Sequence, residues 1–178
     1  MSKAVLISIR PGWCQKIMEG QKTIEVRKTR PKMNPPFKCY IYCTQSADML
    51  WILKERERSL HPDKIADVFK AAKCGGAYRG NGKVIGEFLC DQIININGAG
   101  RIPSDAARPT CLEPAELHQY LGAATGFGWH ISDLCVYDHP RDLWEFTGLR
   151  ETKFGAEPVP ITRPPQSWRY VEEETWND

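Results

Sequence analysis

Three charged residues near the N-terminus have types and spacing suited to binding a polar ligand. Lys22 follows a glycine turn at Gly20, and Glu25 and Arg27 alternate with apolar residues in the segment Thr23–Lys28. This alternation predicts a β-strand, so Glu25 and Arg27 should project from one face about 6.6 Å apart. The set offers an ammonium, a carboxylate acceptor and a forked guanidinium donor. These groups suit a ligand bearing amide or phosphate groups, for example a nucleobase with its sugar phosphate.

The same spacing fits a second interpretation, a solvated strand face that carries a surface ion pair. Surface ion pairs are common and contribute little to stability. The residue types and their spacing leave both interpretations open.

Two tryptophans and an arginine are further candidates for ligand contact. Trp13 comes one helical turn after Arg10, and Trp168 lies near the C-terminus. An indole ring that stacks on a nucleobase contributes about 1–3 kcal/mol, although tryptophans are also common in cores and over the ends of barrels. The basic stretch 27–32 continues from the predicted strand and suits either phosphate contacts or a solvated loop. The apolar patterns around Trp51, Trp129 and Trp144 predict core positions for these three residues.

The sequence does not contain the patterns of several common catalytic centres. None of the four histidines pairs with a cysteine or serine in a recognisable nucleophile arrangement. The glycine clusters lack the lysine and hydroxyl residue of a phosphate-binding loop, and no GxGxxG follows a predicted strand. Seven cysteines contain no CxxC pair, and Cys39 and Cys43 lack a second ligand pair at a spacing usual for zinc. We therefore expect buried free thiols, no metal and no cofactor.

The elements that would position the charged residues follow one another at the start of the chain. A β-branched run at Ala4–Ile9 predicts a buried strand. Pro11 is suited to the first position of a helix, and Gly20 to its end. Further strands are predicted at Lys38–Thr44, Lys83–Asn97 (with a bulge or bend at Gly86), Gly128–Tyr137 and Trp168–Val171, and short helices at Glu113–Leu121 and Pro140–Phe146.

Two segments stand apart from this strand framework. The block 46–73 is rich in helix formers, with Ser46 as a candidate N-cap and Pro62 as a break, and predicts a helical insertion. The proline-rich segment Glu151–Gln166 is expected to be extended and irregular. Strands among short helices, with no βαβ rhythm, predict a single α+β domain over residues 1–178: a small mixed β-barrel with peripheral helices and a helical insertion.

Composition is that of a globular protein, with 42% hydrophobic and 26% charged residues. The net charge of +2 is too small for non-specific attachment to a polyanion, so any nucleic-acid contact would need a local patch. An odd cysteine count, with no apolar segment after the N-terminus, predicts a cytoplasmic protein. No run approaches the roughly 20 apolar residues of a membrane span.

Several motifs resemble those of ASCH domains. The segment Ser8–Pro11, a short helix and then GQKTIEVRK resemble the opening of such domains, with every fixed position of their G-x-K-x-x-E-x-R signature present. The segments KVIGEFLCDQI and PPQSW resemble later parts of bacterial and phage members. The resemblance covers roughly half of the chain. It implies a PUA-like barrel whose cleft takes RNA or a modified nucleoside.

An enzymatic branch of the same family hydrolyses N4-acetylcytidine, and its catalytic lysine would fall on Lys22. Its catalytic threonine would fall on Glu25, so this chain departs from the pattern at a position that the chemistry needs. A lysine beside a carboxylate is held in its charged form and is a poorer base or nucleophile.

We therefore expect a binding module for RNA or a nucleoside, with contacts from Arg10, Trp13, Lys22, Glu25, Arg27 and Trp168. The alternative is a hydrolase of a modified nucleoside or of RNA that uses Lys22 and Glu25. A third possibility is a protein-interaction module whose interface is the helical insertion. The sequence does not determine the oligomeric state.

Overall fold

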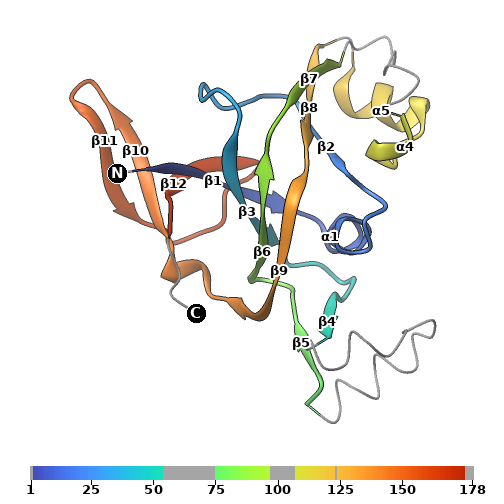
Figure 1. Cartoon of the computed structure of the whole chain (residues 1–178), viewed down its shortest axis with the longest axis horizontal. Coiled ribbons are helices and arrows are strands. Elements are labelled where there is room, and N and C mark those ends of the chain that lie inside the picture. Colours follow the sequence, from blue (N-terminus) through green and yellow to red (C-terminus); the bar gives the residue numbers. More distant parts are fainter. Residues whose placement is uncertain (1, 54–74, 97–106, 123, 175–178) are drawn as a thin grey trace.

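The computed structural model describes residues 2–53, 75–96, 107–122 and 124–174, and strands dominate it (Figure 1). The largest sheet contains β1 (Lys3–Ile9), β3 (Phe37–Cys43), β6 (Val84–Cys90), β9 (Ser132–Arg141), β10 (Thr147–Thr152), β11 (Gly155–Pro160) and β12 (Trp168–Glu172). Its strand order is β11–β10–β12–β1–β3–β6–β9. Only β1 and β3 run parallel, and the other neighbours are antiparallel.

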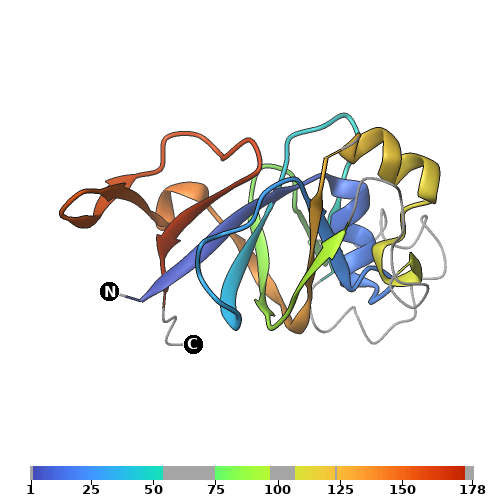
Figure 2. The ribbon, with the colours of Figure 1, turned by 90° about the horizontal axis from the view of Figure 1, so that it is seen from above.

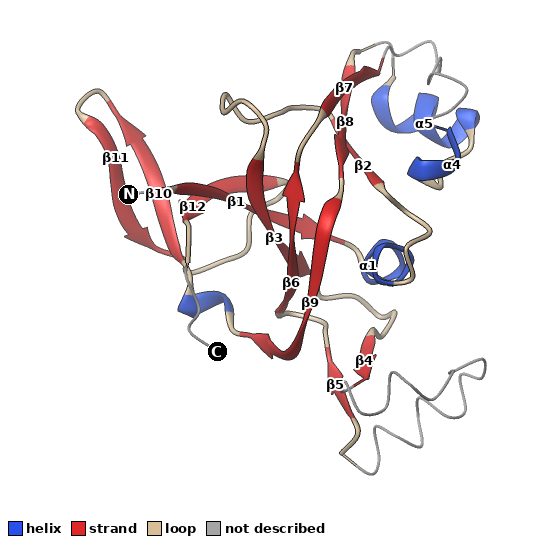
Figure 3. Ribbon diagram, viewed as in Figure 1, coloured by secondary structure: helices blue, strands red, loops and turns tan. Residues whose placement is uncertain are grey.

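Two smaller sheets and several helices complete the described structure (Figure 3). A three-stranded sheet has the order β2 (Ile24–Arg27), β8 (Gly126–His130), β7 (Ile93–Ile96), and a ribbon pairs β4 (Trp51–Leu53) with β5 (Ala77–Arg79). The helices are α1 (Pro11–Met18), α4 (Ala107–Thr110), α5 (Pro114–Leu121) and the 3-10 helix η1 (Leu143–Glu145). Figure 2 shows α1, α4 and α5 gathered at one end of the molecule, with the β10–β11 hairpin projecting at the other.

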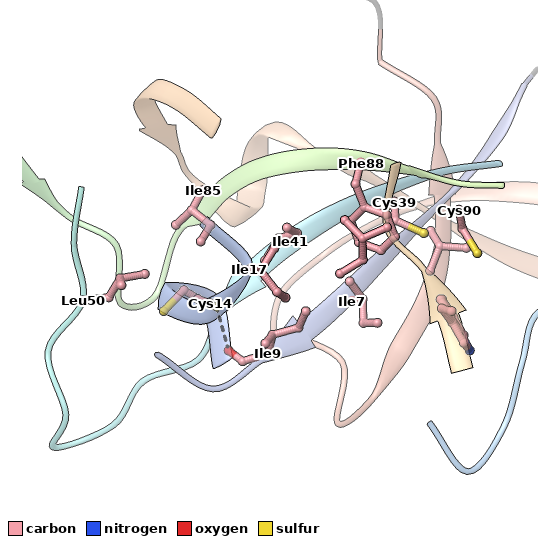
Figure 4. Close-up of a cluster of buried hydrophobic side chains, with 14 of the residues drawn as sticks. Ile7, Ile9, Cys14, Ile17, Cys39, Ile41, Leu50, Ile85, Phe88 and Cys90 are labelled. Carbon is pink, nitrogen blue, oxygen red and sulfur yellow. Dashed lines mark hydrogen bonds between the residues drawn. The ribbon is translucent and has the colours of Figure 1, made fainter. Parts of the chain in front are cut away.

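The core lies on both faces of β1, as its uninterrupted apolar run predicts. Ile7 and Ile9 pack with residues of α1, β3 and β6 in one cluster (Figure 4), whereas Ala4 and Leu6 pack with Tyr40 in another. α1 contributes Cys14 and Ile17 to the first cluster. This packing fixes the N-terminal strand and helix, which in turn fix the start of β2.

The barrel expected from the sequence is not closed among the described residues. The seven-stranded sheet ends at β11 and β9, and the three-stranded sheet ends at β2 and β7. Helices flank these sheets, but β-structure predominates in the described part of the chain, for which the sequence predicted an α+β fold. Alternation predicts which residues form strands but not which strands pair. The sequence pattern therefore could not show whether the sheets close into a barrel.

The predicted helical insertion at 46–73 is wrong where the structure describes it. Residues Trp51–Leu53 form β4, which pairs with β5. Leu50 and Ile52 alternate with exposed or half-buried neighbours and are buried in the core, and the Leu50 N–H donates to Asn81 Oδ1. A short apolar run fits a strand as well as a helix, and tertiary pairing decided between them. The rest of the block, 54–73, lies outside the described residues.

The predicted irregular segment 151–166 is also partly wrong, because β10 and β11 form a regular hairpin. Pro158 and Pro160 lie in β11, at the edge of the sheet, where a strand tolerates a residue without an N–H donor. Trp144, expected in the core, is 75% exposed on η1, whereas Trp129 is fully buried as predicted and Trp51 is half-buried.

Most of the other predicted elements agree with the structure to within a few residues, but the strand predicted at Gly128–Tyr137 is divided between β8 and β9, and only Leu143–Glu145 of the helix predicted at Pro140–Phe146 is helical. β1, α1, β2, β3 and β12 are present, Glu113–Leu121 is α5 with Glu113 as its N-cap, and the strand predicted at 83–97 is divided into β6 and β7. Gly86 lies at a register shift between β6 and β9, as expected. Within the described ranges, no helix has the length and apolar character needed to cross a bilayer.

Candidate ligand-binding pocket

The turn between α1 and β2 places Lys22 and starts the strand that carries Glu25 and Arg27. α1 ends at Met18, and Gly20 takes the left-handed conformation with φ of +71°. The Lys22 N–H then donates to the Lys16 carbonyl at 3.0 Å. Pairing of β2 with β8 fixes which side chains of β2 lie on each face of the strand. The segment Gly20–Arg27 is therefore a turn followed by a strand of defined geometry.

The three charged side chains meet, and they are buried. Glu25 Oε1 lies 3.0 Å from Arg27 Nη2, and Glu25 Oε2 lies 3.4 Å from Lys22 Nζ. The exposed fractions of Lys22, Glu25 and Arg27 are 2%, 6% and 8%. The carboxylate of Glu25 thus bridges two cations that are shielded from bulk water. This burial disagrees with the interpretation of the strand face as a solvated surface with an exposed ion pair.

Arg27 is fixed by two segments that lie far from it in the sequence. Its Nη2 donates to the Ser8 carbonyl at 2.6 Å, and its Nη1 lies 3.4 Å from Ser167 Oγ. Its Nε is buried and has no hydrogen-bond partner among the described residues. An unpaired buried donor costs about 1–3 kcal/mol.

Lys22 is fixed from the opposite side by α4 and α1. Its Nζ donates to the Thr110 carbonyl at 2.7 Å, and it lies 5.0 Å from the centre of the Trp13 ring. The Lys16 Nζ lies at the same distance from that ring. The ammonium of Lys22 is therefore surrounded by a carbonyl, a carboxylate and an aromatic face, all of which stabilise its positive charge.

These side chains line a pocket of about 410 Å³. Its lining residues come from β1, α1, β2, α5 and the segments that precede α1 and β2 or follow β3, α4 and β11: Ser8, Ile9, Arg10, Trp13, Lys22, Glu25, Val26, Arg27, Thr44, Leu112, Tyr120 and Gln166. Arg10, Lys22 and Arg27 are cations, and Glu25 is the single carboxylate of this lining. The pocket thus has an excess of positive charge and suits a ligand rich in hydrogen-bond acceptors.

The structure brings five of the six residues expected at a site into this pocket. Arg10 is exposed at the pocket, and among the described residues it has no ion-pair partner. Trp168 is absent from the lining. Its ring packs 6.0 Å from that of Trp129, and its Nε1–H donates to Thr29 Oγ1. In the described structure, Trp168 therefore supports the core beneath β12.

Sequence reasoning missed the polar residues that α5 and the C-terminal segment add. Tyr120 lies on the exposed side of α5, and Gln166 belongs to the PPQSW segment that also supplies Ser167. Burial raises the pKa of Tyr120, while Arg27 acts to lower it and Glu25 to raise it. The PPQSW motif was a signal for Gln166. No comparable signal distinguished Tyr120 from other exposed tyrosines.

A buried thiol lies directly behind the pocket. Cys14 donates its S–H to the carbonyl of Ile9, a lining residue (Figure 4). Burial, followed by the neighbouring Cys43, raises the pKa of Cys14 well above its ordinary value. This thiol is therefore protonated and acts as a small apolar packing group. Within the described residues, no group of three or more His, Cys, Asp and Glu side chains is arranged to hold a metal ion.

Comparison with known structures identifies the architecture. A protein named ASCH from Zymomonas mobilis is 17% identical, with a TM-score of 0.55 and coverage of 96% of this chain and 88% of that one. The fold is that of ASCH proteins. Two point mutants of that protein match equally, each with 16% identity and a TM-score of 0.55, covering 97% and 96% of this chain and 92% and 89% of theirs.

The ASCH fold agrees with the resemblance noted in the sequence, and the similarity extends through most of the chain. A scan against family models and a search of curated proteins found no match. At this level of identity the similarity concerns the ASCH fold, so the function rests on the pocket itself.

Proposed function

We propose that the pocket binds a nucleobase, either as a modified nucleoside or within an RNA strand. The observation that carries this proposal is the buried Lys22–Glu25–Arg27 cluster at the wall of a 410 Å³ pocket. Cytosine and guanine each present a carbonyl and an amino group on one edge. Arg27 supplies a donor for the carbonyl, and each oxygen of Glu25 can accept a second hydrogen bond, from the amino group.

The balance of charge supports the same class of ligand. Three cations and one carboxylate line the pocket, so a base with carbonyl acceptors, or a nucleotide with a phosphate, complements the excess positive charge. Arg10 is exposed at the pocket and suits contact with a sugar phosphate. The contacts proposed for the ligand are therefore Arg10, Lys22, Glu25 and Arg27, with Trp13 in the wall.

Direct binding measurements test this proposal. Cytidine, N4-acetylcytidine, uridine and a single-stranded RNA oligonucleotide are titrated into the wild-type protein by calorimetry. We expect at least one to bind, and we expect Lys22→Met to weaken that binding about tenfold or more, as loss of a charged hydrogen-bond donor implies. Methionine keeps most of the lysine stem, so the pocket wall keeps its packing.

A lysine outside the pocket provides the control. Lys153 is exposed in the β10–β11 turn and does not line the pocket. Lys153→Met changes the net charge equally and should bind as wild type does. If wild type and Lys22→Met bound the ligand with equal affinity and had matching circular dichroism spectra, the ligand would not bind at Lys22 in this pocket.

A second candidate function is hydrolysis of an acylated nucleoside or of RNA. It is favoured by the 3.4 Å approach of Lys22 Nζ to Glu25 Oε2 inside the pocket. In this candidate, Lys22 would stabilise a developing oxyanion by donating a hydrogen bond to it. Release of acetate from N4-acetylcytidine, or cleavage of the oligonucleotide, above the rate of Lys22→Met would support this candidate. If the protein bound these compounds tightly but did not hydrolyse them, this candidate would be wrong and ligand binding would remain the proposed function.

A further inference from the structure

Tyr120 is placed at the pocket by the packing of α5 on β2. Leu117 and Leu121 are the buried residues of α5, and they form a cluster with Val26. Val26 lies between Glu25 and Arg27 on β2, so the anchored face of the helix lies beside the charged strand. Tyr120 precedes Leu121 and lines the pocket with 40% of its surface exposed. The packing of α5 therefore fixes the backbone of Tyr120, while its side chain stays partly exposed at the pocket.

The other aromatic residue of the lining, Trp13, has less of its ring available. The ammonium groups of Lys16 and Lys22 each lie 5.0 Å from its ring centre. Two ammonium groups repel each other, which disfavours their sharing one face of the indole. Among the described residues, the Tyr120 ring contacts a single ammonium, that of Lys28 at 5.2 Å. Tyr120 therefore has the more accessible π surface of the two.

We propose that Tyr120, rather than Trp13, is the residue on which the planar group of the ligand stacks. This inference rests on the proposed function, because it assumes that a nucleobase occupies the pocket. The Lys28 ammonium can occupy only one face of the Tyr120 ring, so the other face is left for the ligand, and the same ammonium would attract the phosphate of a bound nucleotide. Trp13 then serves to hold the Lys22 ammonium in place.

Substitutions that separate the ring from the hydroxyl test this inference. Calorimetric titration with N4-acetylcytidine, cytidine and the RNA oligonucleotide is repeated for Tyr120→Phe and Tyr120→Leu. Loss of stacking in Tyr120→Leu should weaken binding about 5- to 150-fold. Tyr120→Phe keeps an equivalent π face and should bind within about threefold of wild type. Gln119→Ala, at the neighbouring exposed position of α5, should bind as wild type does.

The outcomes distinguish this inference from the proposed function. Wild-type affinity in Tyr120→Leu, combined with weakened binding in Lys22→Met, would overturn the stacking role alone. An equal loss in Tyr120→Phe and Tyr120→Leu would also overturn it, because the hydroxyl and not the ring would then be required. Failure of the wild-type protein to bind any of the probes would overturn both proposals. Thermal melts of the Tyr120 variants should match wild type, since the side chain is substantially exposed.

Discussion

Glu25 and Arg27 lie two residues apart on β2, and their side chains form an ion pair of 3.0 Å in which both residues are more than nine-tenths buried. Lys22 occupies the second oxygen of the same carboxylate. Burial of charges is costly, and it is tolerated here because each charge has partners. The stability of the cluster therefore depends on Glu25, since Glu25 is its single acidic member.

Glu25→Gln should be strongly destabilising. The substitution leaves the buried Lys22 and Arg27 cations without their shared counter-charge, which costs about 3–5 kcal/mol in the free energy of unfolding. Urea denaturation at neutral pH measures the change. Glu157→Gln is the matched control, because the Arg150–Glu157 pair is exposed and should change stability by less than about 1 kcal/mol. Similar small effects in both variants would show that the Glu25 pairs are weak.

The alternation of β2 predicted which side chains share a face, and the structure adds what surrounds that face. Besides Glu25, the partners of Arg27 are Ser8, 19 residues away, and Ser167, 140 residues away. Strand alternation carries no information about such distant contacts, so it could not tell a buried cluster from an exposed pair. Tyr120 was missed for the same reason, since only the packing of α5 on Val26 brings it to the pocket.

At β4 the sequence-based prediction was wrong for a different reason, because local helix propensity outweighed strand pairing in the prediction. The composition of the block 46–73 predicts a helix at Trp51–Leu53, but pairing with β5 makes this segment a strand. That pairing joins segments on either side of residues 54–74, and helix propensity is a weak guide when tertiary pairing opposes it. Gly86 was predictable because its local role, a bend in a strand, is set by its own lack of a side chain.

Gly86→Ala should destabilise the central sheet. A Cβ at this position would lie 2.3 Å from the Cys135 carbonyl oxygen, so β6 and β9 would have to separate. We expect a loss of about 1–3 kcal/mol in the free energy of unfolding, typical of forced overpacking. Gly12→Ala is the control, because its Cβ would meet nothing within 4 Å in α1 and should raise stability by about 0.5–1 kcal/mol. Equal effects from the two substitutions would contradict the close β6–β9 approach.

Alkaline pH should destabilise the protein through its buried thiols. Burial, and then the neighbouring Asp91, raises the pKa of Cys90 from 9.0 to about 12. Above pH 9 the unfolded chain loses this proton while the folded protein keeps it, so stability falls as pH rises towards 12. Each such group contributes a slope of about 1.4 kcal/mol per pH unit in this window.

Cys90→Ala isolates the contribution of this thiol. Urea denaturation from pH 7 to pH 11, in the presence of a reductant, should give parallel stability curves for variant and wild type up to about pH 8. Above pH 9 the free energy of unfolding of the wild type should fall more steeply with pH than that of the variant, by up to about 1.4 kcal/mol per pH unit. Parallel curves throughout this range would show that the Cys90 thiol ionises equally in both states.

Arg10→Ala should distinguish a nucleotide ligand from a nucleoside. Arg10 is an exposed cation of the pocket lining, so it is available to contact a phosphate outside the buried cluster. Binding of cytidine 5′-monophosphate should weaken about fivefold, whereas cytidine should bind as before, because an exposed charged contact contributes about 1 kcal/mol. The difference should shrink at 1 M salt, where the Debye length falls to about 3 Å.

Arg163→Ala, at an exposed position outside the pocket, should affect neither ligand. Unchanged nucleotide affinity in Arg10→Ala would exclude a phosphate contact at this residue, and equal weakening of both ligands would place Arg10 against the base or sugar.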